Sequence, residues 1–141
     1  MVRLANINDA QQLYELNKLF NGENTSSIEN VNFSLLSNKN EIIIVDEQDN
    51  NLTGFICLQI KTSFCYEESS AEITELYIKE EYRNKDIAKS LLHFTEKYCK
   101  EKLNINKVEL ITNKANIKAQ SLYKKSGYAM QDHIHFIKKI N

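Results

Sequence analysis

The feature that most constrains the fold is the order of its apolar patterns: three strand-like segments and then a long helical one. Residues 41–46, 52–60 and 71–78 are rich in β-branched and aromatic residues, which favours strands. The run Asp49-Asn50-Asn51 between the first two is typical of a hairpin turn. From about residue 84 to 102, apolar residues recur every three or four positions, which predicts an amphipathic helix. An antiparallel meander that leads into a helix is therefore expected.

Shorter patterns complete the expected order of elements. A helix over 10–20, capped by Asn8 or Asp9, and a second helix over 27–36 precede the meander. A strand–helix–strand unit behind the meander predicts an α+β domain, whose mixed, mostly antiparallel sheet contains one parallel strand pair. The later elements are a strand at 107–112, a helix at 117–125 ended by Ser126 and Gly127, and a last strand near 134–140.

Composition limits the class of protein. The 141 residues contain no proline, no internal repeat and no low-complexity segment, so one domain over residues 1–141 is expected. Hydrophobic residues make up 42% and charged residues 26% without a long apolar run, which argues against disorder and a membrane span. The first residues lack the apolar stretch of a secretory signal, so we expect a cytoplasmic protein. Cys57, Cys65 and Cys99 form no CxxC pair, and their odd number favours reduced core thiols over disulfides or a metal site.

Charge is distributed unevenly, although the formal net charge is only −1. Residues 1–70 hold four basic and ten acidic residues, whereas 71–141 hold 14 basic and nine acidic ones. The basic half suits a polyanionic ligand and the acidic half a cationic one. Lysines of the basic half are interleaved with carboxylates such as Glu96 and Glu101, so they form no single basic stripe. No nucleic-acid binding is therefore expected.

The candidate chemistry concentrates where the third strand leads into the long helix. A helix start offers unpaired backbone N–H groups and the positive end of the helix dipole. Arg83, Lys85 and Lys89 add positive charge there, so this turn can hold a pyrophosphate. The alternative interpretation is a solvated helix start with a favourable Asp86 in its first turn.

Two motifs in this order carry a family resemblance. Arg83 and Ala88 match the ends of the pattern Arg/Gln-x-x-Gly-x-Gly/Ala, while Asp86 brings bulk and negative charge where the pattern has its first glycine. The later pattern Asn-x-x-Ala-x-x-Leu-Tyr-x-x-x-Gly-Phe/Tyr is complete from Asn116 to Tyr128. With these motifs and the matching order of elements, the chain resembles the GNAT acetyltransferases over nearly its whole length, most weakly over 21–40.

The resemblance implies the GNAT fold, in which the strand before the first motif splays from its parallel neighbour and binds coenzyme A. Acetyl-CoA would be the acyl-donor cosubstrate, and no metal is expected. Backbone groups of the strand would pair with the pantetheine arm, and the following turn would hold the pyrophosphate. Tyr123 would protonate the departing thiolate. The implied cofactor-binding residues are Leu76, Tyr77, Ile78, Arg83, Asn84, Lys85, Asp86, Ile87, Ala88, Lys89, Asn116 and Tyr123.

Two carboxylates are candidates for the catalytic base. Glu72 and Glu75 lie on the strand that would run beside the thioester, and either could take the proton of an attacking amine. Strand alternation puts them on opposite faces unless a bulge intervenes, and the family often has a bulge there. Both stay candidates, with a slight preference for Glu75.

The predicted activity is transfer of an acetyl group to a primary amine by direct attack in a ternary complex. The loop at 61–70 and the acidic first half suit a small cationic acceptor, and His133 and His135 could line the same pocket. The alternatives are an acyl-CoA-binding or regulatory domain without catalysis, and a protein-lysine or N-terminal acetyltransferase. A homodimer is suggested by family habit alone.

Overall fold

A computed structural model describes residues 1–141 as two compact units, 1–111 and 112–141. The first unit contains a five-stranded sheet in the order β1-β2-β3-β4-β5. Neighbouring strands are antiparallel except β4 and β5, which are parallel, so the predicted mixed sheet with one parallel pair is confirmed. The strands are β1 (Val2–Leu4), β2 (Glu41–Gln48), β3 (Asn51–Lys61), β4 (Ser70–Ile78) and β5 (Val108–Leu110).

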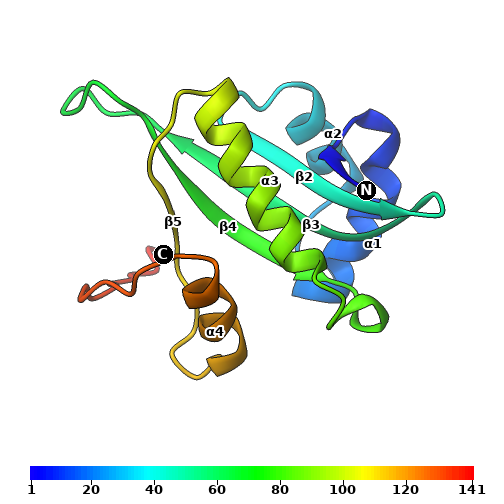
Figure 1. The fold of residues 1–141 in the computed structure, drawn as a ribbon. Helices are drawn as coiled ribbons and strands as arrows, with labels where there is room; N and C mark the ends of the chain where they lie inside the picture. Colours follow the sequence, from blue (N-terminus) through cyan, green and yellow to red (C-terminus); the bar gives the residue numbers. More distant parts are fainter. The chain divides into compact units, whose positions relative to one another are not determined.

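Three helices cover the two faces of this sheet. Helix α3 (Ile87–Lys102) crosses one face, and α1 (Ala10–Asn21) and α2 (Ile28–Leu36) lie on the other (Figure 1). The second unit contains α4 (Ile117–Lys125). Two single turns of 3-10 helix, η1 (Ile7–Asp9) and η2 (Glu80–Tyr82), precede α1 and α3. No helix has both the length and the apolar character that crossing a bilayer requires.

The β2–β3 hairpin contains an irregularity that decides which residues face each helix layer. Asp49 and Asn50 both have positive φ, at 50° and 65°, as a two-residue type I′ turn requires. Gln48 pairs with Asn51 and Glu47 with Leu52, but Asp46 already pairs with Gly54. Thr53 is thus an extra residue, and every pair beyond it is shifted by one position.

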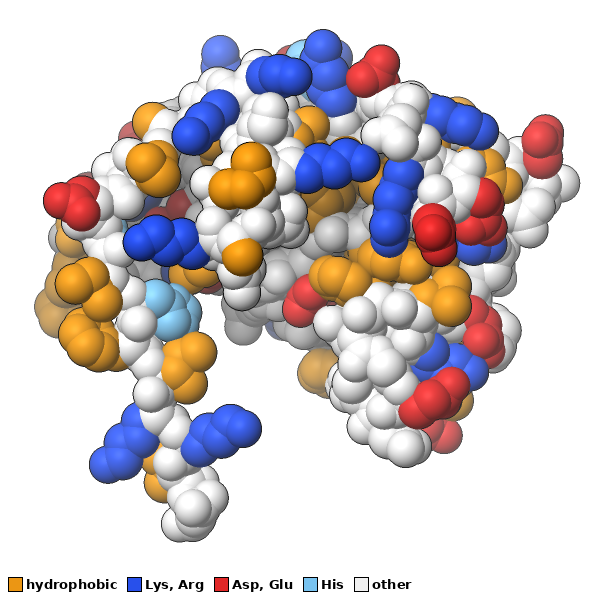
Figure 2. Space-filling view, turned by 90° about the horizontal axis from the view of Figure 1, so that it is seen from below, with side chains coloured by type: hydrophobic (Ala, Val, Ile, Leu, Met, Phe, Trp, Pro, Cys, Tyr) orange, Lys and Arg blue, Asp and Glu red, His pale blue; other side chains and the backbone are white.

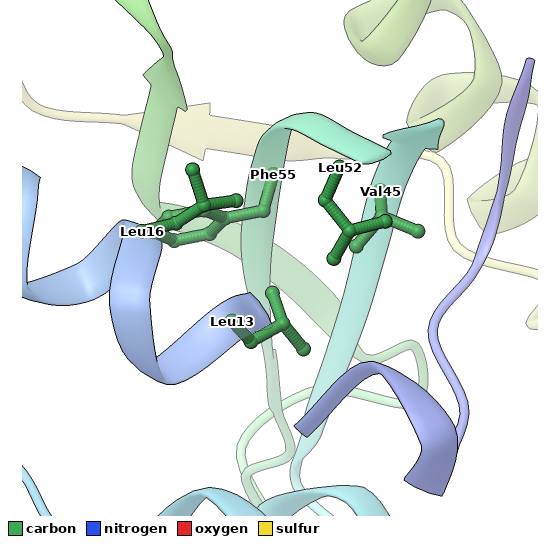
Figure 3. Close-up of a cluster of buried hydrophobic side chains, with 5 residues drawn as sticks. All are labelled: Leu13, Leu16, Val45, Leu52 and Phe55. Carbon is green, nitrogen blue, oxygen red and sulfur yellow. The ribbon is translucent and has the colours of Figure 1, made fainter. Parts of the chain in front are cut away.

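The core beneath α1 joins this helix to β2 and β3. Leu13 and Leu16 point from α1 onto Val45, Leu52 and Phe55 of the sheet, and all five side chains are buried (Figure 3). Burying an aliphatic or aromatic side chain of this size stabilises a fold by about 1.5–3 kcal/mol. The helical spacing of the apolar residues in 10–20 therefore predicted this contact surface correctly.

The opposite core lies beneath α3. Its buried residues recur at helical spacing, and the buried Thr95 hydroxyl donates to the Leu91 carbonyl at 2.8 Å, so no polar group is left unpaired there. Strand alternation directs a second set of buried residues toward this helix. The helix residues are Ile87, Leu91, Leu92, Thr95 and Cys99, and the strand residues include Ile44, Ile56, Leu58 and Ile73. The expected core position is confirmed for Cys99, whereas Cys57 is half-buried and Cys65 is exposed.

Three local features differ from the sequence-based expectation. Strand β1 was not predicted, because three residues are too few for a periodic signal. The cap before α1 comes from Asn6 and not from the side chain of Asn8: the Asn6 side chain accepts from the Asn8 N–H at 2.9 Å, and the Asp9 carboxylate accepts from the Asn6 N–H at 2.8 Å. Strand β5 has three residues instead of six, and α3 begins at Ile87 instead of about residue 84.

The strand expected near 134–140 does not form. Residues 129–141 have no regular structure, and their apolar side chains are exposed; Figure 2 shows apolar side chains at the protein surface. An alternating apolar pattern becomes a strand only where a neighbouring strand accepts its backbone hydrogen bonds, and the pattern itself does not specify that neighbour. The exposed residues are Met130, Ile134, Phe136, Ile137 and Ile140.

The close approach of β3 to β4 at Gly54 gives a stability prediction. A Cβ at this position would lie 2.6 Å from the Tyr77 carbonyl oxygen and 2.6 Å from Ile78 Cδ1. We expect Gly54→Ala to lower the free energy of unfolding by about 1–3 kcal/mol, because a crowded core must shift to admit the methyl group. Urea unfolding followed by circular dichroism measures this change.

A double mutant separates the two obstacles to a side chain at Gly54. Ile78→Val removes the Cδ1 atom and leaves the Tyr77 carbonyl in place. If the Ile78 side chain contributes to the strain, Gly54→Ala should cost less in the Ile78→Val background than in the native protein. An unchanged unfolding free energy for Gly54→Ala itself would contradict the close approach.

Candidate functional site

The parallel pairing of β4 with β5 is short and leaves one side of β4 open. Only Ala71–Ile73 pair with Val108–Leu110, and the rest of β4 pairs with β3 alone. The Lys79 N–H bonds to β3, so alternation turns the backbone groups of Leu76 and Ile78 toward the open side. These groups, two residues apart, can pair with the amides of an extended ligand.

The turn after β4 presents the N-terminus of α3. Asn84 and Asp86 have φ of 63° and 61°, which no helix accommodates and which explains the late start of α3. Asp86 occupies the N-cap position in a left-handed conformation, and its side chain caps no backbone N–H group. The first N–H groups of α3 are therefore available to an anion, with the exposed Lys85 and Lys89 nearby in sequence.

Arg83 ties this turn to the end of β4. Its Nε donates to the Ile78 carbonyl at 2.9 Å, and its guanidinium carbon lies 5.7 Å from the centre of the Tyr77 ring. Tyr77 in turn stacks on Phe20 of α1 at 4.9 Å between ring centres. The guanidinium thus occupies one backbone acceptor on the open side of β4, a contact that the sequence does not reveal.

A bulge in β4 brings the two candidate bases to the same face. Leu58 pairs with Ile73 and Cys57 with Glu75, so Thr74 is an extra residue. Glu72 and Glu75 therefore lie on the face covered by α1 and α2, opposite Gln59 and Cys57 of β3. The bulge that the family resemblance implied is present.

The two carboxylates differ in their surroundings. Lys61 Nζ lies 2.9 Å from Glu72 Oε1 and 2.8 Å from Glu109 Oε1, so Glu72 is neutralised by an ion pair. Glu75 is half-buried and has neither a hydrogen-bond donor nor a cation of the chain as a partner. Burial raises the pKa of the Glu75 carboxyl, and the charge of Glu41 raises it further. Glu75 is therefore the stronger base of the two.

Several residues around Glu75 had no signal in the sequence analysis. Glu41 accepts hydrogen bonds from Ser34 Oγ at 2.7 Å and from Gln59 Nε2 at 2.8 Å. A shallow depression in the surface is lined by Asn40, Gln59, Ile60, Lys61, Thr62 and Glu72. Only the strand register, which depends on both bulges, assembles these residues.

The second unit contains the complete later motif on and after α4. Asn116 caps the helix, since its Oδ1 accepts from the Ala119 N–H at 3.1 Å. Gly127 has φ of 93°, and the N–H groups of Gly127 and Tyr128 bond to the carbonyls of Lys124 and Tyr123, which is the Schellman arrangement. The motif's asparagine and glycine thus define the two ends of this helix.

Tyr123 is half-buried on α4. Its ring meets that of Tyr128 edge to face, with 6.1 Å between ring centres. Burial raises the pKa of the Tyr123 phenol, so the phenol is protonated at neutral pH and can serve as a proton donor.

A sequence model of the acetyltransferase (GNAT) family matches residues 7–128. The chain belongs to this family. Among curated relatives, a spermidine N(1)-acetyltransferase of Thermoplasma acidophilum is 37% identical over 84 residues, which cover 60% of this chain and 48% of that protein. A putative [ribosomal protein bS18]-alanine N-acetyltransferase of Bacillus subtilis is 33% identical over 93 residues, or 66% and 57% of the two chains. The chain spans about half the length of the curated relatives it matches.

Solved structures show the same fold. The structure of AAC(6')-Iy in complex with the bisubstrate analog CoA-S-monomethyl-acetylneamine has a TM-score of 0.86, with 16% identity, and covers 100% of this chain and 98% of its own. This likeness confirms the GNAT fold that the motifs implied.

The strained turn at Asp86 gives a prediction about the cofactor site of this GNAT protein. Asp86→Gly removes a side chain from a left-handed residue and a negative charge from the anion site, so it should raise the free energy of unfolding by about 0.5–1 kcal/mol and tighten acetyl-CoA binding. Thermal unfolding and isothermal titration measure the two effects.

Asp86→Asn is the matched control for this prediction. Asparagine tolerates positive φ nearly as well as glycine and keeps the size of aspartate, so it removes only the charge. Equal affinity gains in both variants would assign the handicap to charge, and a gain in the glycine variant alone would assign it to bulk. Weaker binding by Asp86→Gly would contradict the prediction and give Asp86 a positive role.

Proposed function

We propose that this protein is an acetyl-CoA-dependent N-acetyltransferase that acetylates the primary amine of a small cationic acceptor. One observation carries the proposal: β4 holds the unpaired carboxylate of Glu75, continues as an open backbone edge, and leads through one turn into the free N-terminus of α3. A base, a binding edge for an extended ligand and an anion site thus follow one another along a single segment.

The residues of this segment fit coenzyme A. The N–H groups at the start of α3, with Lys85 and Lys89, would hold the pyrophosphate. The open backbone groups of Leu76 would pair with the pantetheine arm, as would Ile78 where Arg83 leaves room. When bound, acetyl-CoA supplies the thioester as acyl donor.

Glu75 is the proposed general base. An amine is mostly protonated near neutral pH and must lose a proton before it attacks a carbonyl carbon. A carboxylate of raised proton affinity accepts that proton more readily than one paired with lysine, which favours Glu75 over Glu72. Tyr123 is the proposed acid that protonates the departing thiolate, so the transfer needs no covalent enzyme intermediate.

The acceptor is proposed from the charge of this face. Glu41, Glu72 and Glu75 share it, and Lys61 offsets only part of their charge. The named relatives act on spermidine and on an alanine amine, so a polyamine-like molecule is the first candidate and a protein N-terminus the second. The proposal further comprises a single domain over 1–141 in the cytoplasm.

A second candidate function is favoured by one observation. Asp86 places a side chain and a negative charge in the turn where the family pattern has glycine. A domain that binds acyl-CoA weakly and regulates without catalysis would tolerate this change. The two functions differ in turnover.

An acceptor screen tests the proposal. Release of free thiol from acetyl-CoA is followed with polyamines, aminoglycosides, simple monoamines and alanine-ended peptides, and mass spectrometry identifies the product. Acetylation of a cationic small amine is the expected result. Acetyl-CoA binding without turnover of any amine would favour the regulatory domain.

Replacement of the two carboxylates should separate their roles. Glu75→Gln should lower kcat by roughly a hundredfold or more, because general base catalysis contributes on that order. It should also remove the acidic limb of the pH–rate profile, along which the native rate falls as Glu75 becomes protonated. Glu72→Gln is the matched variant and should keep that limb. A preserved limb in Glu75→Gln would exclude Glu75 as the base.

Loss of the Tyr123 hydroxyl should affect chemistry more than binding. Tyr123→Phe keeps the ring and its contact with Tyr128. We expect a lower kcat with little change in acetyl-CoA affinity, because the proton is needed only as thiolate character develops. Stopped-flow or steady-state kinetics with titration calorimetry check both quantities, and native activity would reduce Tyr123 to a packing role.

A further inference from the structure

The position of Glu41 is determined by the strand register. Glu41 pairs with Gln59, and two residues further along the same strands Ile43 pairs with Cys57. Cys57 pairs in turn with Glu75 on β4. Glu41 and Glu75 therefore project from the same face of the sheet, two strands apart, a separation of about 10 Å at the backbone that their side chains can shorten.

The Glu41 carboxylate is held in place without being neutralised. Ser34 of α2 donates to one oxygen at 2.7 Å, and Gln59 of β3 donates to the other at 2.8 Å. Both donors are uncharged, so they orient the carboxylate and leave its negative charge in place.

No cation of the chain stands between the two carboxylates. Lys61 is the lysine of this face, and it contacts Glu72 and Glu109. In α1, Lys18 pairs with Glu15 and lies over the Tyr14 ring, and Glu29 of α2 lies in an exposed first turn. The remaining ionisable groups of β3 and β4 on this face are Cys57 and Tyr77, which are uncharged at neutral pH.

We infer that Glu41 is a positioning residue that acts through Glu75: its fixed negative charge makes Glu75 a stronger base for the proposed transfer. A like charge nearby disfavours the ionised form of a carboxyl and so increases its affinity for a proton. The same arrangement explains the thiol between them, because burial and the charges of Glu41 and Glu75 raise the pKa of Cys57. The inference rests on the proposed function in its catalytic consequence.

Titration of Glu75 tests the electrostatic part directly. Carbon-13 NMR of the glutamate carboxyl groups gives the midpoint of Glu75, whose resonance is assigned by its loss in Glu75→Gln. In Glu41→Gln this midpoint should move to lower pH, because the repelling charge is gone while an amide oxygen can still accept from Ser34. Glu29→Gln removes the same charge at the exposed end of α2 and should leave the midpoint unchanged.

Kinetics test the catalytic part. The acidic limb of the pH–rate profile should shift to lower pH in Glu41→Gln, so that at a fixed pH on this limb the rate rises roughly two- to fivefold. Glu41→Asp, which keeps the charge, should restore most of the native profile. A merely structural Glu41 would lower thermal stability without moving the limb.

The outcomes separate this inference from the proposed function. An unchanged Glu75 midpoint in Glu41→Gln overturns the inference and leaves the acetyltransferase proposal intact. A lower midpoint with a pH–rate limb that does not follow overturns the role in catalysis and removes Glu75 as the base. A lower midpoint with a limb that moves in step supports both.

Discussion

The position of Thr74 is the constraint on which the candidate site depends. In a regular strand, successive side chains alternate between faces, and residues three apart project to opposite sides. One extra residue in β4 cancels this rule and turns Glu75 to the face of Glu72. Without the bulge, Glu75 would point toward α3 and its hydrophobic core, where an unpaired carboxylate is costly.

The parallel strand pair has a complementary role. Because β5 pairs with only three residues of β4, the sheet is complete enough to bury its core and still leaves backbone groups of β4 open beside α3. Arg83 bonds to one of these groups and so links the turn to the strand. A long parallel pairing would have satisfied the same groups internally and removed the binding edge.

The site also contains the features that stability alone would not favour. Asp86 holds a left-handed conformation without capping its helix, and Glu75 lies half-buried without a partner. The rest of the chain follows local rules closely, with a capping box before α1 and a Schellman ending after α4. Departures from local rules that gather at one place are typical of a functional site.

The sequence by itself determined the element types, the amphipathic faces of α1 and α3, the parallel pair and the two family motifs, because each depends on residues close together in the chain. It did not determine the register. The turn at Asp49 and Asn50 alone would pair Glu41 with Leu58, and only the extra residue Thr53 moves Glu41 opposite Gln59 and onto the face of Glu75. The absent strand at 134–140 and the contact of Arg83 with Ile78 have the same cause. Backbone pairing joins residues far apart in sequence, and its energy is decided by the neighbour that the folded chain supplies.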